Sequence, residues 1–219
     1  MAGVRTALIT GGEGDLARAI GAELAAQGWR VVSPGRAALD VADERSVTAF
    51  FSSLDRLDLL VVNAGVLDDR PVASLPPEGW DRVLAVNLGG AFLCLRAALP
   101  LLERSAGSAA LIGSRVGRRG AAGQAAYAAA KAGLIALAQT AAAEHGAAGV
   151  RCNVVLPGFL ETRMVREVAP PRRQTILGEH RLGRFNTAEE TARFVAFLAT
   201  LENASGQVFQ LDSRSDRWT

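Results

Sequence analysis

The sequence has little of the chemistry on which several protein classes depend. It contains two cysteines, Cys94 and Cys152, and neither lies in a CxxC or Cys/His pattern. The two histidines, His145 and His180, show no spacing typical of a metal site, so no metal is expected. A disulfide framework is not expected either, and two reduced, buried thiols favour a cytoplasmic protein.

Excess charge and long apolar runs are missing as well. The 24 basic and 22 acidic residues leave a net charge of +2, and no basic run is interleaved with aromatic residues, so no nucleic-acid partner is expected. No apolar stretch is expected to span a membrane, and the apolar run before Gly11 is too short for a signal-peptide core. With 219 residues, 49% of them hydrophobic, the chain is expected to fold as a single domain over residues 1–219.

The two scarcest residue types occur together. Tyr127 is the only tyrosine and Lys131 the only lysine, since every other basic residue is arginine. Residues four apart share one helix face, so the two side chains are expected side by side. An ammonium beside the phenol favours phenolate and lowers a pKa that is ordinarily about 10, which would let Tyr127 act as acid or base near neutral pH. The alternative is that Lys131 is a chance remnant in an arginine-rich chain.

Short apolar runs alternate with helical patterns along the chain. Six of them have the character of strands, at residues 4–10, 29–33, 58–62, 109–113, 150–156 and 207–211. This alternation predicts an α/β fold with a single doubly wound, Rossmann-type parallel sheet flanked by helices. Between Arg36 and Leu39 the chain is too short for the crossover that a parallel neighbour needs. We therefore expect the helix after strand two to be deleted and strand three to be lost or reduced to an extended segment.

Glycines follow the first strand directly, in the run from Gly11 to Asp15. Strand, glycine turn and helix place backbone N–H groups where a pyrophosphate binds, although a tight turn that needs positive φ would have the same composition. Ser33 and Arg36 follow the second strand, with no acid until Asp40. A basic residue here accommodates a 2′-phosphate, which favours NADPH over NADH unless Arg36 is a solvated loop residue.

Candidate chemical groups come at the carboxyl ends of strands, the edge where open α/β sheets hold ligands. They are the glycine turn, residues 63–65 and Ser114. A serine hydroxyl, a tyrosine of altered pKa and a nicotinamide together fit hydride transfer to or from a carbonyl. Ser114 would bond the substrate oxygen, Tyr127 would give it a proton and Lys131 would lower the phenol pKa. Hydrolysis fits poorly, because neither histidine has a placed partner that would complete a triad.

At these residues the sequence resembles the short-chain dehydrogenase/reductase family, over essentially its whole length. The matching pieces are TGGEGDLA at 10–17, NAG at 63–65, Asn87, Ser114, YAAAK at 127–131 and LPGFLET at 156–162. The resemblance implies catalytic roles for Asn87, Ser114, Tyr127 and Lys131, with Asn87 and Lys131 linked through a water that relays protons. Asn87 taken alone could equally be a satisfied core amide. Together with Ser33 and Arg36, the expected cofactor contacts are Thr10, Gly11, Gly12, Glu13, Gly14, Asp15, Leu16, Asp40, Val41, Asn63, Ala64, Gly65, Tyr127, Lys131, Pro157, Gly158 and Thr162.

Within the family, residues 123–164 look most like the 3-oxoacyl-[acyl-carrier-protein] reductases of fatty-acid or polyketide synthesis. This implies reduction of a 3-oxoacyl thioester by NADPH, with NADH as the alternative cofactor, in a homo-oligomer that is a dimer or a tetramer. Six arginines fall in residues 159–186, a segment in which no regular structure is expected. They could receive an acidic acyl carrier protein or a phosphopantetheine phosphate, or belong to a solvated lid at about 159–187. The alternatives are a dehydrogenase of a small alcohol, sugar or other ketone and, from another class, a catalytically weak nucleotide-binding regulatory or scaffold subunit.

The chain departs from the family pattern in three places. The glycine loop usually reads TGxxxGxG, but Asp15 and Ala17 occupy its second and third glycine positions. Asp15 is expected either to cap the following helix or, as a carboxylate near the pyrophosphate, to weaken cofactor binding. The shortened region after Arg36 removes part of the adenosine wall. Residues 212–214, DSR, replace the usual Asp-Gly-Gly of a segment that often packs at a subunit interface, which makes tetramer formation less certain.

Overall fold

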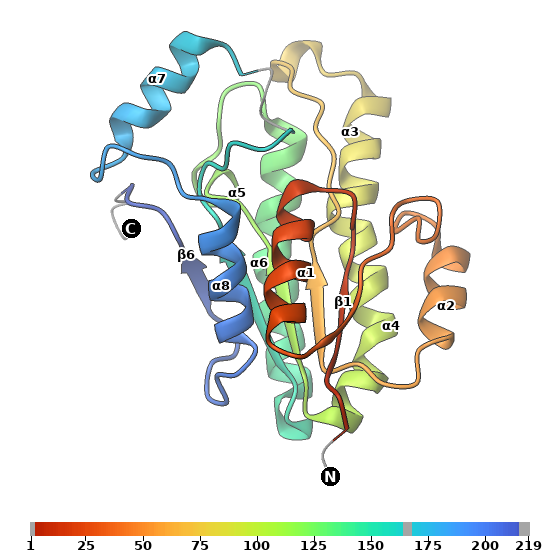
Figure 1. Cartoon of the computed structure of the whole chain (residues 1–219). Helices are drawn as coiled ribbons and strands as arrows, with labels where there is room; N and C mark the ends of the chain where they lie inside the picture. Colours follow the sequence, from red (N-terminus) through yellow and green to blue (C-terminus); the bar gives the residue numbers. More distant parts are fainter. Residues whose placement is uncertain (1–2, 164–167, 215–219) are drawn as a thin grey trace.

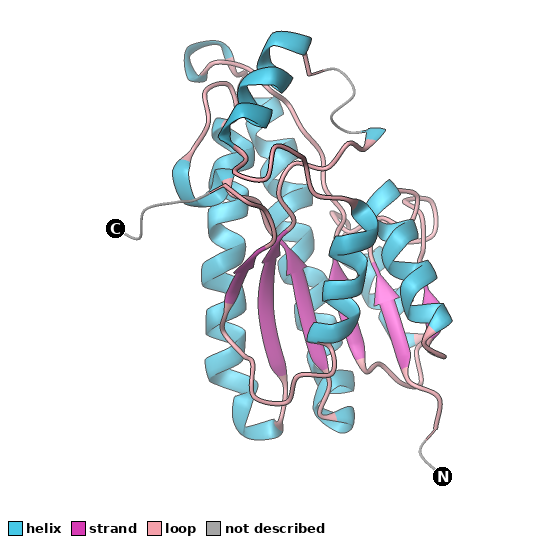
Figure 2. Cartoon of the chain, turned by 60° about the vertical axis from the view of Figure 1, so that its left-hand side comes forward, coloured by secondary structure: helices cyan, strands magenta, loops and turns pink. Residues whose placement is uncertain are grey.

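The computed structural model describes residues 3–163 and 168–214, which form a six-stranded parallel sheet between layers of helices (Figure 1, Figure 2). The strand order is β2-β1-β3-β4-β5-β6, and each neighbouring pair runs parallel. In chain order the strands are β1 (Thr6–Ile9), β2 (Arg30–Val32), β3 (Leu59–Val62), β4 (Ser108–Ile112), β5 (Arg151–Leu156) and β6 (Val208–Gln210). The predicted Rossmann-type α/β fold is confirmed.

Helices connect the strands and cover both faces of the sheet. They are α1 (Asp15–Ala26), α2 (Glu44–Ser52), α3 (Pro77–Leu84), α4 (Gly90–Ser105), α5 (Val116–Arg119), α6 (Ala125–His145), α7 (Pro170–Glu179) and α8 (Ala188–Leu198), with short turns η1 (Val72–Ser74), η2 (Ala85–Gly89) and η3 (Gly146–Ala148). Helices α1 and α8 pack together on one face, in front in Figure 1. The opposite face is covered by α2, α4 and α6.

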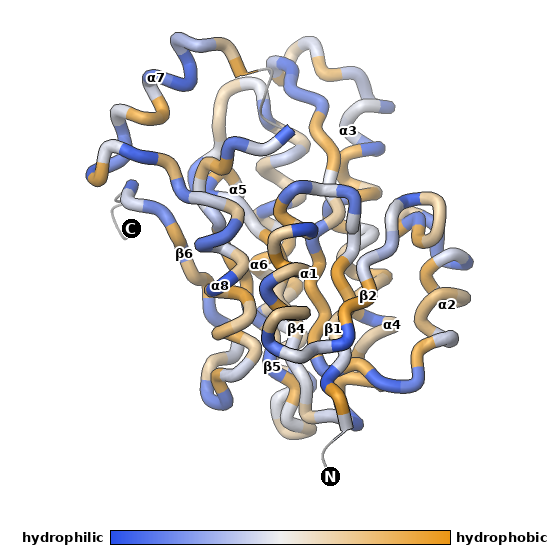
Figure 3. The backbone as a smooth tube through the Cα atoms, in the orientation of Figure 1, coloured by the Kyte–Doolittle hydropathy of each residue, from blue (hydrophilic) through white to orange (hydrophobic). Residues whose placement is uncertain are grey.

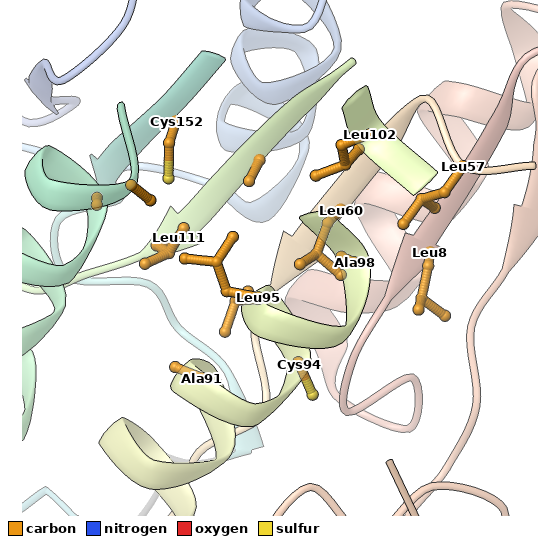
Figure 4. Packing of buried hydrophobic residues seen from close by; sticks show 14 of the residues in the cluster. Leu8, Leu57, Leu60, Ala91, Cys94, Leu95, Ala98, Leu102, Leu111 and Cys152 are labelled. Carbon is orange, nitrogen blue, oxygen red and sulfur yellow. The ribbon is translucent and has the colours of Figure 1, made fainter. Parts of the chain in front are cut away.

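Strand residues alternate between the two resulting cores, because successive side chains of a strand point to opposite faces. On β1, Leu8 packs in the core with α2, α4 and α6, whereas Ile9 packs in the core with α1 and α8. The central strands form apolar segments of the tube in Figure 3. Figure 4 shows Leu60 and Leu111, from neighbouring strands, close to Leu95 of α4. Burial on both faces explains why the strands read as continuous apolar runs in the sequence.

The connection from β2 to α2 contains turns but no helix or strand over residues 33–43. Leu39 and Val41 of this connection are buried in the core beside α4. The contact with α4 is close, since a Cβ on Gly90 would lie 2.7 Å from a Val41 methyl carbon. Apolar side chains of a short loop therefore close the core at this edge of the sheet.

The stretch Pro77–Ser105, made of α3, η2 and α4, is long and apolar enough to cross a membrane by length and composition. This differs from the expectation from the sequence. Its residues Cys94, Leu95 and Leu102 are buried against the sheet (Figure 4). In this fold the stretch is therefore packed as a core helix.

The segment after β5 contains regular structure that the sequence analysis missed. Helix α7 begins at Pro170, a position where the missing N–H of proline removes no helical hydrogen bond. The two ends of the segment lie side by side, because Leu160 and Asn186 form an isolated bridge and Asn186 Nδ2 donates to the Pro157 carbonyl oxygen at 2.9 Å. Helix α7 is thus carried on an excursion that begins and ends beside β5.

Candidate active site

A cavity of about 1400 Å³ lies at the carboxyl ends of β1, β3, β4 and β5. Most residues predicted for cofactor binding and catalysis line it, namely Gly11, Glu13, Gly14, Asp15, Leu16, Arg36, Asp40, Val41, Asn63, Ala64, Gly65, Ser114, Tyr127, Lys131, Pro157, Gly158 and Thr162. Four predicted residues do not line it, namely Thr10, Gly12, Ser33 and Asn87. The strand ends thus bring together residues that lie far apart in the chain.

Three of these four residues, Thr10, Gly12 and Ser33, contact the loops that line the cavity. Thr10 is fully buried, and its Oγ1 accepts hydrogen bonds from the N–H groups of Asn63 and Ala64 at 2.9 and 3.0 Å. Gly12 packs so closely on Ser33 that a Cβ would lie 2.2 Å from the Ser33 carbonyl oxygen. Thr10, Gly12 and Ser33 therefore position the loops after β1, β2 and β3 relative to one another.

Ser114 and Tyr127 meet at the cavity. Ser114 follows β4, Tyr127 lies in the first turn of α6, and their side chains are hydrogen-bonded to each other. Burial raises the pKa of Tyr127 to about 12, although the hydrogen bond from Ser114 lowers it and the Asp69 carboxylate raises it further. The phenol is therefore protonated at neutral pH.

Lys131 lies one helical turn after Tyr127 and is buried. Its Nζ donates to the Ile112 carbonyl oxygen at 2.7 Å and lies 5.5 Å from the centroid of the Tyr127 ring. Burial lowers the pKa of Lys131 to about 8. The expected net lowering of the Tyr127 pKa is wrong, because burial of the phenol raises it.

Asn87 lies in the π-helical turn η2, and its side chain is 1% exposed. Its Oδ1 accepts from the N–H of Val66, and its Nδ2 donates to the carbonyl oxygen of Val66, both at 2.8 Å. Single π-helical turns are frequent at functional sites. Here the side chain joins this turn to the loop after β3, and that loop forms one wall of the cavity.

Asp15 does not cap α1, which was one of the two expectations for it. The N-cap is Gly14, without a side-chain hydrogen bond, and Asp15 is the first helical residue. The Asp15 carboxylate accepts from the backbone N–H of Arg163 at 2.7 Å and from Arg163 Nε at 2.8 Å. The Arg163 guanidinium also donates to the Glu13 carbonyl oxygen. The acid at a glycine position therefore faces a cation from the segment after β5.

The glycine loop has the geometry of a phosphate site. Gly11 has a positive φ of 69°, and a Cβ on it would lie 2.9 Å from the Cα of Ala64, so the loop packs directly on the end of β3. The first turn of α1 directs N–H groups without helical partners toward the cavity edge, as a bound pyrophosphate requires. These residues fit a dinucleotide.

The end of the cavity beside β2 carries both signs of charge. Arg36 Nε donates to Asp40 Oδ2 at 3.1 Å, so Arg36 is an ion-paired residue of the cavity wall. Glu13 lies nearby, since a Cβ on Gly35 would be 2.6 Å from a Glu13 carboxylate oxygen. A guanidinium suits a 2′-phosphate and a carboxylate suits a ribose hydroxyl. This end of the cavity therefore has groups suited to NADPH and groups suited to NADH.

Gly117 is a site residue that the sequence analysis missed. It lies in α5, and a Cβ on it would lie 2.6 Å from the carbonyl carbon of Lys131 in α6. Only glycine allows α5 to approach the backbone of α6 at the turn that carries Lys131. The small residue shortly before Tyr127 was the available signal, but its partner is visible only in the folded chain.

A second feature that was missed connects α7 with the end of the chain. Glu179 of α7 lies 3.1 Å from Arg115 and 3.8 Å from Arg214. Arg214 in turn pairs with Asp212, whose side chain is fully buried. Arg214 stands where the family usually has glycine, so this departure ties the C-terminal segment to α7 and to the residue after Ser114.

Comparisons with known proteins agree with this geometry. A family model described as enoyl-(acyl carrier protein) reductase matches residues 15–213. The chain is 34% identical over 223 residues to the 3-oxoacyl-[acyl-carrier-protein] reductase of Escherichia coli (strain K12), with 91% of each chain covered. The chain belongs to the short-chain dehydrogenase/reductase family. As a member of this family it is an oxidoreductase that acts on CH–OH and C=O groups.

Two further relatives are named for reactions at the third carbon of an acyl chain. The 3-oxoacyl-[acyl-carrier-protein] reductase of Thermotoga maritima is 39% identical over 160 residues, which cover 72% of this chain and 65% of the relative. The (3R)-3-hydroxyacyl-CoA dehydrogenase of Mus musculus is 42% identical over 172 residues, which cover 77% of this chain and 64% of the relative. These names share an acyl chain oxidised or reduced at its third carbon and differ in the carrier of that chain. The family implies a nicotinamide cofactor.

Proposed function

We propose that this enzyme reduces a 3-oxoacyl thioester to the 3-hydroxyacyl thioester with NADPH, in fatty-acid or polyketide-type biosynthesis. The hydrogen-bonded pair of Ser114 and Tyr127 at the cavity carries the proposal, because it places a phenol proton and a second hydroxyl together where a carbonyl oxygen can bind. Reduction of a carbonyl requires a proton donor for the oxygen as the hydride arrives at carbon. The Tyr127 phenol carries such a proton at neutral pH, and the alkoxide formed by hydride addition is a stronger base than the phenolate that remains.

Each polar side chain has a defined role in this reaction. Ser114 hydrogen-bonds the substrate carbonyl oxygen, and Tyr127 transfers its proton to that oxygen. The nicotinamide, when bound, supplies the hydride to the third carbon. The Lys131 ammonium, 5.5 Å from the Tyr127 ring centroid, stabilises the phenolate that remains. Lys131 then gives a proton to the phenolate, and the relay water that links Asn87 to Lys131 replaces that proton from solvent.

The cofactor proposal depends on the two ends of the cavity. Gly11, Gly14 and the first turn of α1 hold the pyrophosphate, and Pro157, Gly158 and Thr162, which also line the cavity, contact the nicotinamide half of the cofactor. Arg36 supports NADPH, because its guanidinium lies at the end of the cavity beside β2. Glu13 and Asp40 support NADH as the alternative.

The substrate enters beneath α7, whose residues Arg172 and Ile176 line the cavity. We propose a thioester carried by an acidic acyl carrier protein, since the names of several relatives include that carrier and Arg172 offers a cation at the opening. A coenzyme A thioester is the alternative, supported by the mouse relative. A cytoplasmic homo-oligomer, dimer or tetramer, completes the proposal.

The proposal is tested by following NADPH absorbance with acetoacetyl thioester as substrate. Crotonyl thioester serves as the enoyl control, NADH is run in parallel, and Tyr127→Phe is the catalytic control. We expect oxidation of NADPH with acetoacetyl thioester alone, at a rate at least about 100-fold lower in the variant, because the proton donor is lost. Turnover of the crotonyl thioester, or no turnover of the acetoacetyl thioester by a protein that binds cofactor, would contradict the proposal.

A further inference from the structure

The Asp15 carboxylate stands at the place where a dinucleotide needs a positive environment. Asp15 is the first residue of α1 and lines the cavity between Gly14 and Leu16. The pyrophosphate proposed to bind here carries negative charge, so a carboxylate without a cation beside it would repel the ligand. The chain therefore needs a compensating group if this loop is to bind NADPH.

Arg163 has the position and the geometry of that group. It lines the same cavity, and its backbone N–H and its Nε engage different oxygens of the Asp15 carboxylate, at 2.7 and 2.8 Å. Charge-assisted contacts of this two-point kind are directional as well as strong. The two contacts place the positive charge of Arg163 directly against the carboxylate at the start of α1.

A further contact fixes the arginine to the loop itself. The Arg163 guanidinium donates to the Glu13 carbonyl oxygen, within the glycine loop. Just before Arg163, the N–H of Thr162 donates to the Leu160 carbonyl oxygen at 2.9 Å, which holds this part of the chain in a turn. The loop after β1 and the segment after β5, which both line the same cavity, are therefore joined through one arginine.

We propose that Arg163 is a positioning residue that neutralises Asp15, so that the Asp15–Arg163 pair takes the place of the second glycine of the family's loop in binding the cofactor pyrophosphate. The inference rests on the proposed dinucleotide site and adds a residue that neither the glycine pattern nor the catalytic set contains. It has a specific consequence. Arg163 is needed for cofactor binding only while residue 15 is an acid.

The test is calorimetric titration of NADPH into the full chain without acyl substrate. The proteins compared are the wild type, Arg163→Ala, Asp15→Gly and the double variant. Arg163→Ala is expected to weaken binding about tenfold, within the range of coupling between contacting residues. Asp15→Gly is expected to bind at least as tightly as the wild type, and Arg163→Ala added to it should change the Kd less than about twofold. The Kd of Arg163→Lys for NADPH should lie between those of the wild type and Arg163→Ala, because lysine keeps the charge but loses the planar guanidinium.

Arg96→Ala is the matched control. Its side chain is 50% exposed, as is that of Arg163, and it pairs with Glu44 at 2.5 Å on residues that do not line this cavity. Its Kd for NADPH should equal that of the wild type. If Arg163→Ala weakens NADPH binding equally with and without Asp15→Gly, Arg163 contacts the cofactor directly and the proposal is overturned. No loss of NADPH affinity in either background would also overturn it.

The titration separates this inference from the proposed reaction. A wild-type protein that binds NADPH and shows the expected coupling, yet reduces no thioester, would contradict the proposed function alone. A wild-type protein that binds neither NADPH nor NADH would overturn both.

Discussion

The charge states of Tyr127 and Lys131 determine what this pair of side chains can do. Burial raises the pKa of the phenol to about 12 and lowers the pKa of the ammonium to about 8. Near neutral pH both groups therefore hold their protons, so the phenol has a proton to give to the substrate oxygen and the ammonium has a charge that stabilises the phenolate. The pair supplies an acid for the reductive direction.

Lys131 should make stability depend on pH in the alkaline range. Its folded pKa of about 8 lies below the ordinary value of 10.5, so between these values the unfolded chain holds a proton that the folded chain lacks. The free energy of unfolding contributed by this group therefore rises with pH across that window. In Lys131→Met this part of the rise should be absent, as measured by urea unfolding at pH values of about 8 and about 10. Identical pH slopes in the two proteins would contradict the assignment; the opposite contribution of Tyr127 begins only above its ordinary pKa of 10.

Arg36 should discriminate between the two cofactors. If its guanidinium binds the 2′-phosphate, Arg36→Ala should raise the Kd for NADPH about tenfold or more and the Kd for NADH less than about threefold, since a hydrogen bond to a charged group contributes about 1.5–3 kcal/mol. Fluorescence titration with each cofactor measures both constants. Equal losses would show that Arg36 serves only its ion pair with Asp40.

Some individual residues of the site could be predicted from the sequence, and others could not. Ser114 at a strand end and Tyr127 on the next helix were recognisable from the sequence, because strand ends gather at one edge. The direction of the Tyr127 pKa shift was not, since it depends on burial by distant elements. The partner of Asp15 could not be predicted either, because Arg163 lies 148 residues away in the chain.

The contact between α5 and α6 positions the catalytic turn. A side chain at Gly117 would meet backbone atoms, with a Cβ 2.6 Å from the Lys131 carbonyl carbon and 2.7 Å from the Ala132 nitrogen. Backbone cannot move aside without displacing the helix that carries Tyr127. Gly117→Val should therefore lower kcat about tenfold or more, because misplacement by about 1 Å costs rates of this order.

Steady-state kinetics and the thermal unfolding midpoint together test the role of Gly117. Gly146→Val is the control, because a Cβ there meets nothing within 4 Å. We expect full activity from the control. Wild-type activity in Gly117→Val would show that the close approach of α5 is not needed.

Helix α7 is the element expected to meet the carrier protein. Arg173 bonds Glu161, whereas Arg172 lines the cavity, and Arg166 lies outside the described residues. Arg172→Glu should raise the KM for an acyl carrier substrate several-fold and leave the KM for a short thioester analogue unchanged, because only the carrier presents an acidic surface. Arg193→Glu, exposed on α8 away from the cavity, controls for the change in net charge. Parallel changes with both substrates would remove the docking role.

The helices and strands differ in how strongly the sequence predicts them. Helices α1 and α6 carry several buried residues, and the strands are continuous apolar runs, so periodicity predicts them. In helix α7, Ile176 is buried and Leu177 is half-buried, whereas its other residues are exposed. With so little apolar pattern, this stretch of sequence does not predict a helix.

For the whole molecule, the alternation of strands and helices was enough to predict a parallel, doubly wound sheet. Because parallel strands end at one edge, the same pattern also predicted that the glycine loop, residues 63–65 and Ser114 would share a site. The way in which the shortened connection after β2 closes the core could not be predicted, since it depends on Leu39 entering that core and on Val41 packing against Gly90 of a distant helix. The oligomeric state stays a prediction.

The central claim is hydride transfer to the third carbon of an acyl thioester, with Tyr127 as the proton donor. Its most direct test is the reaction of acetoacetyl thioester with NADPH deuterated at both C4 positions of the nicotinamide, followed by mass spectrometry of the product. The account predicts a 3-hydroxybutyryl thioester with a single deuterium on the third carbon, formed at least about 100-fold more slowly by Tyr127→Phe. Deuterium in a saturated product made from crotonyl thioester, or no labelled product from a wild-type enzyme that binds NADPH, would contradict it.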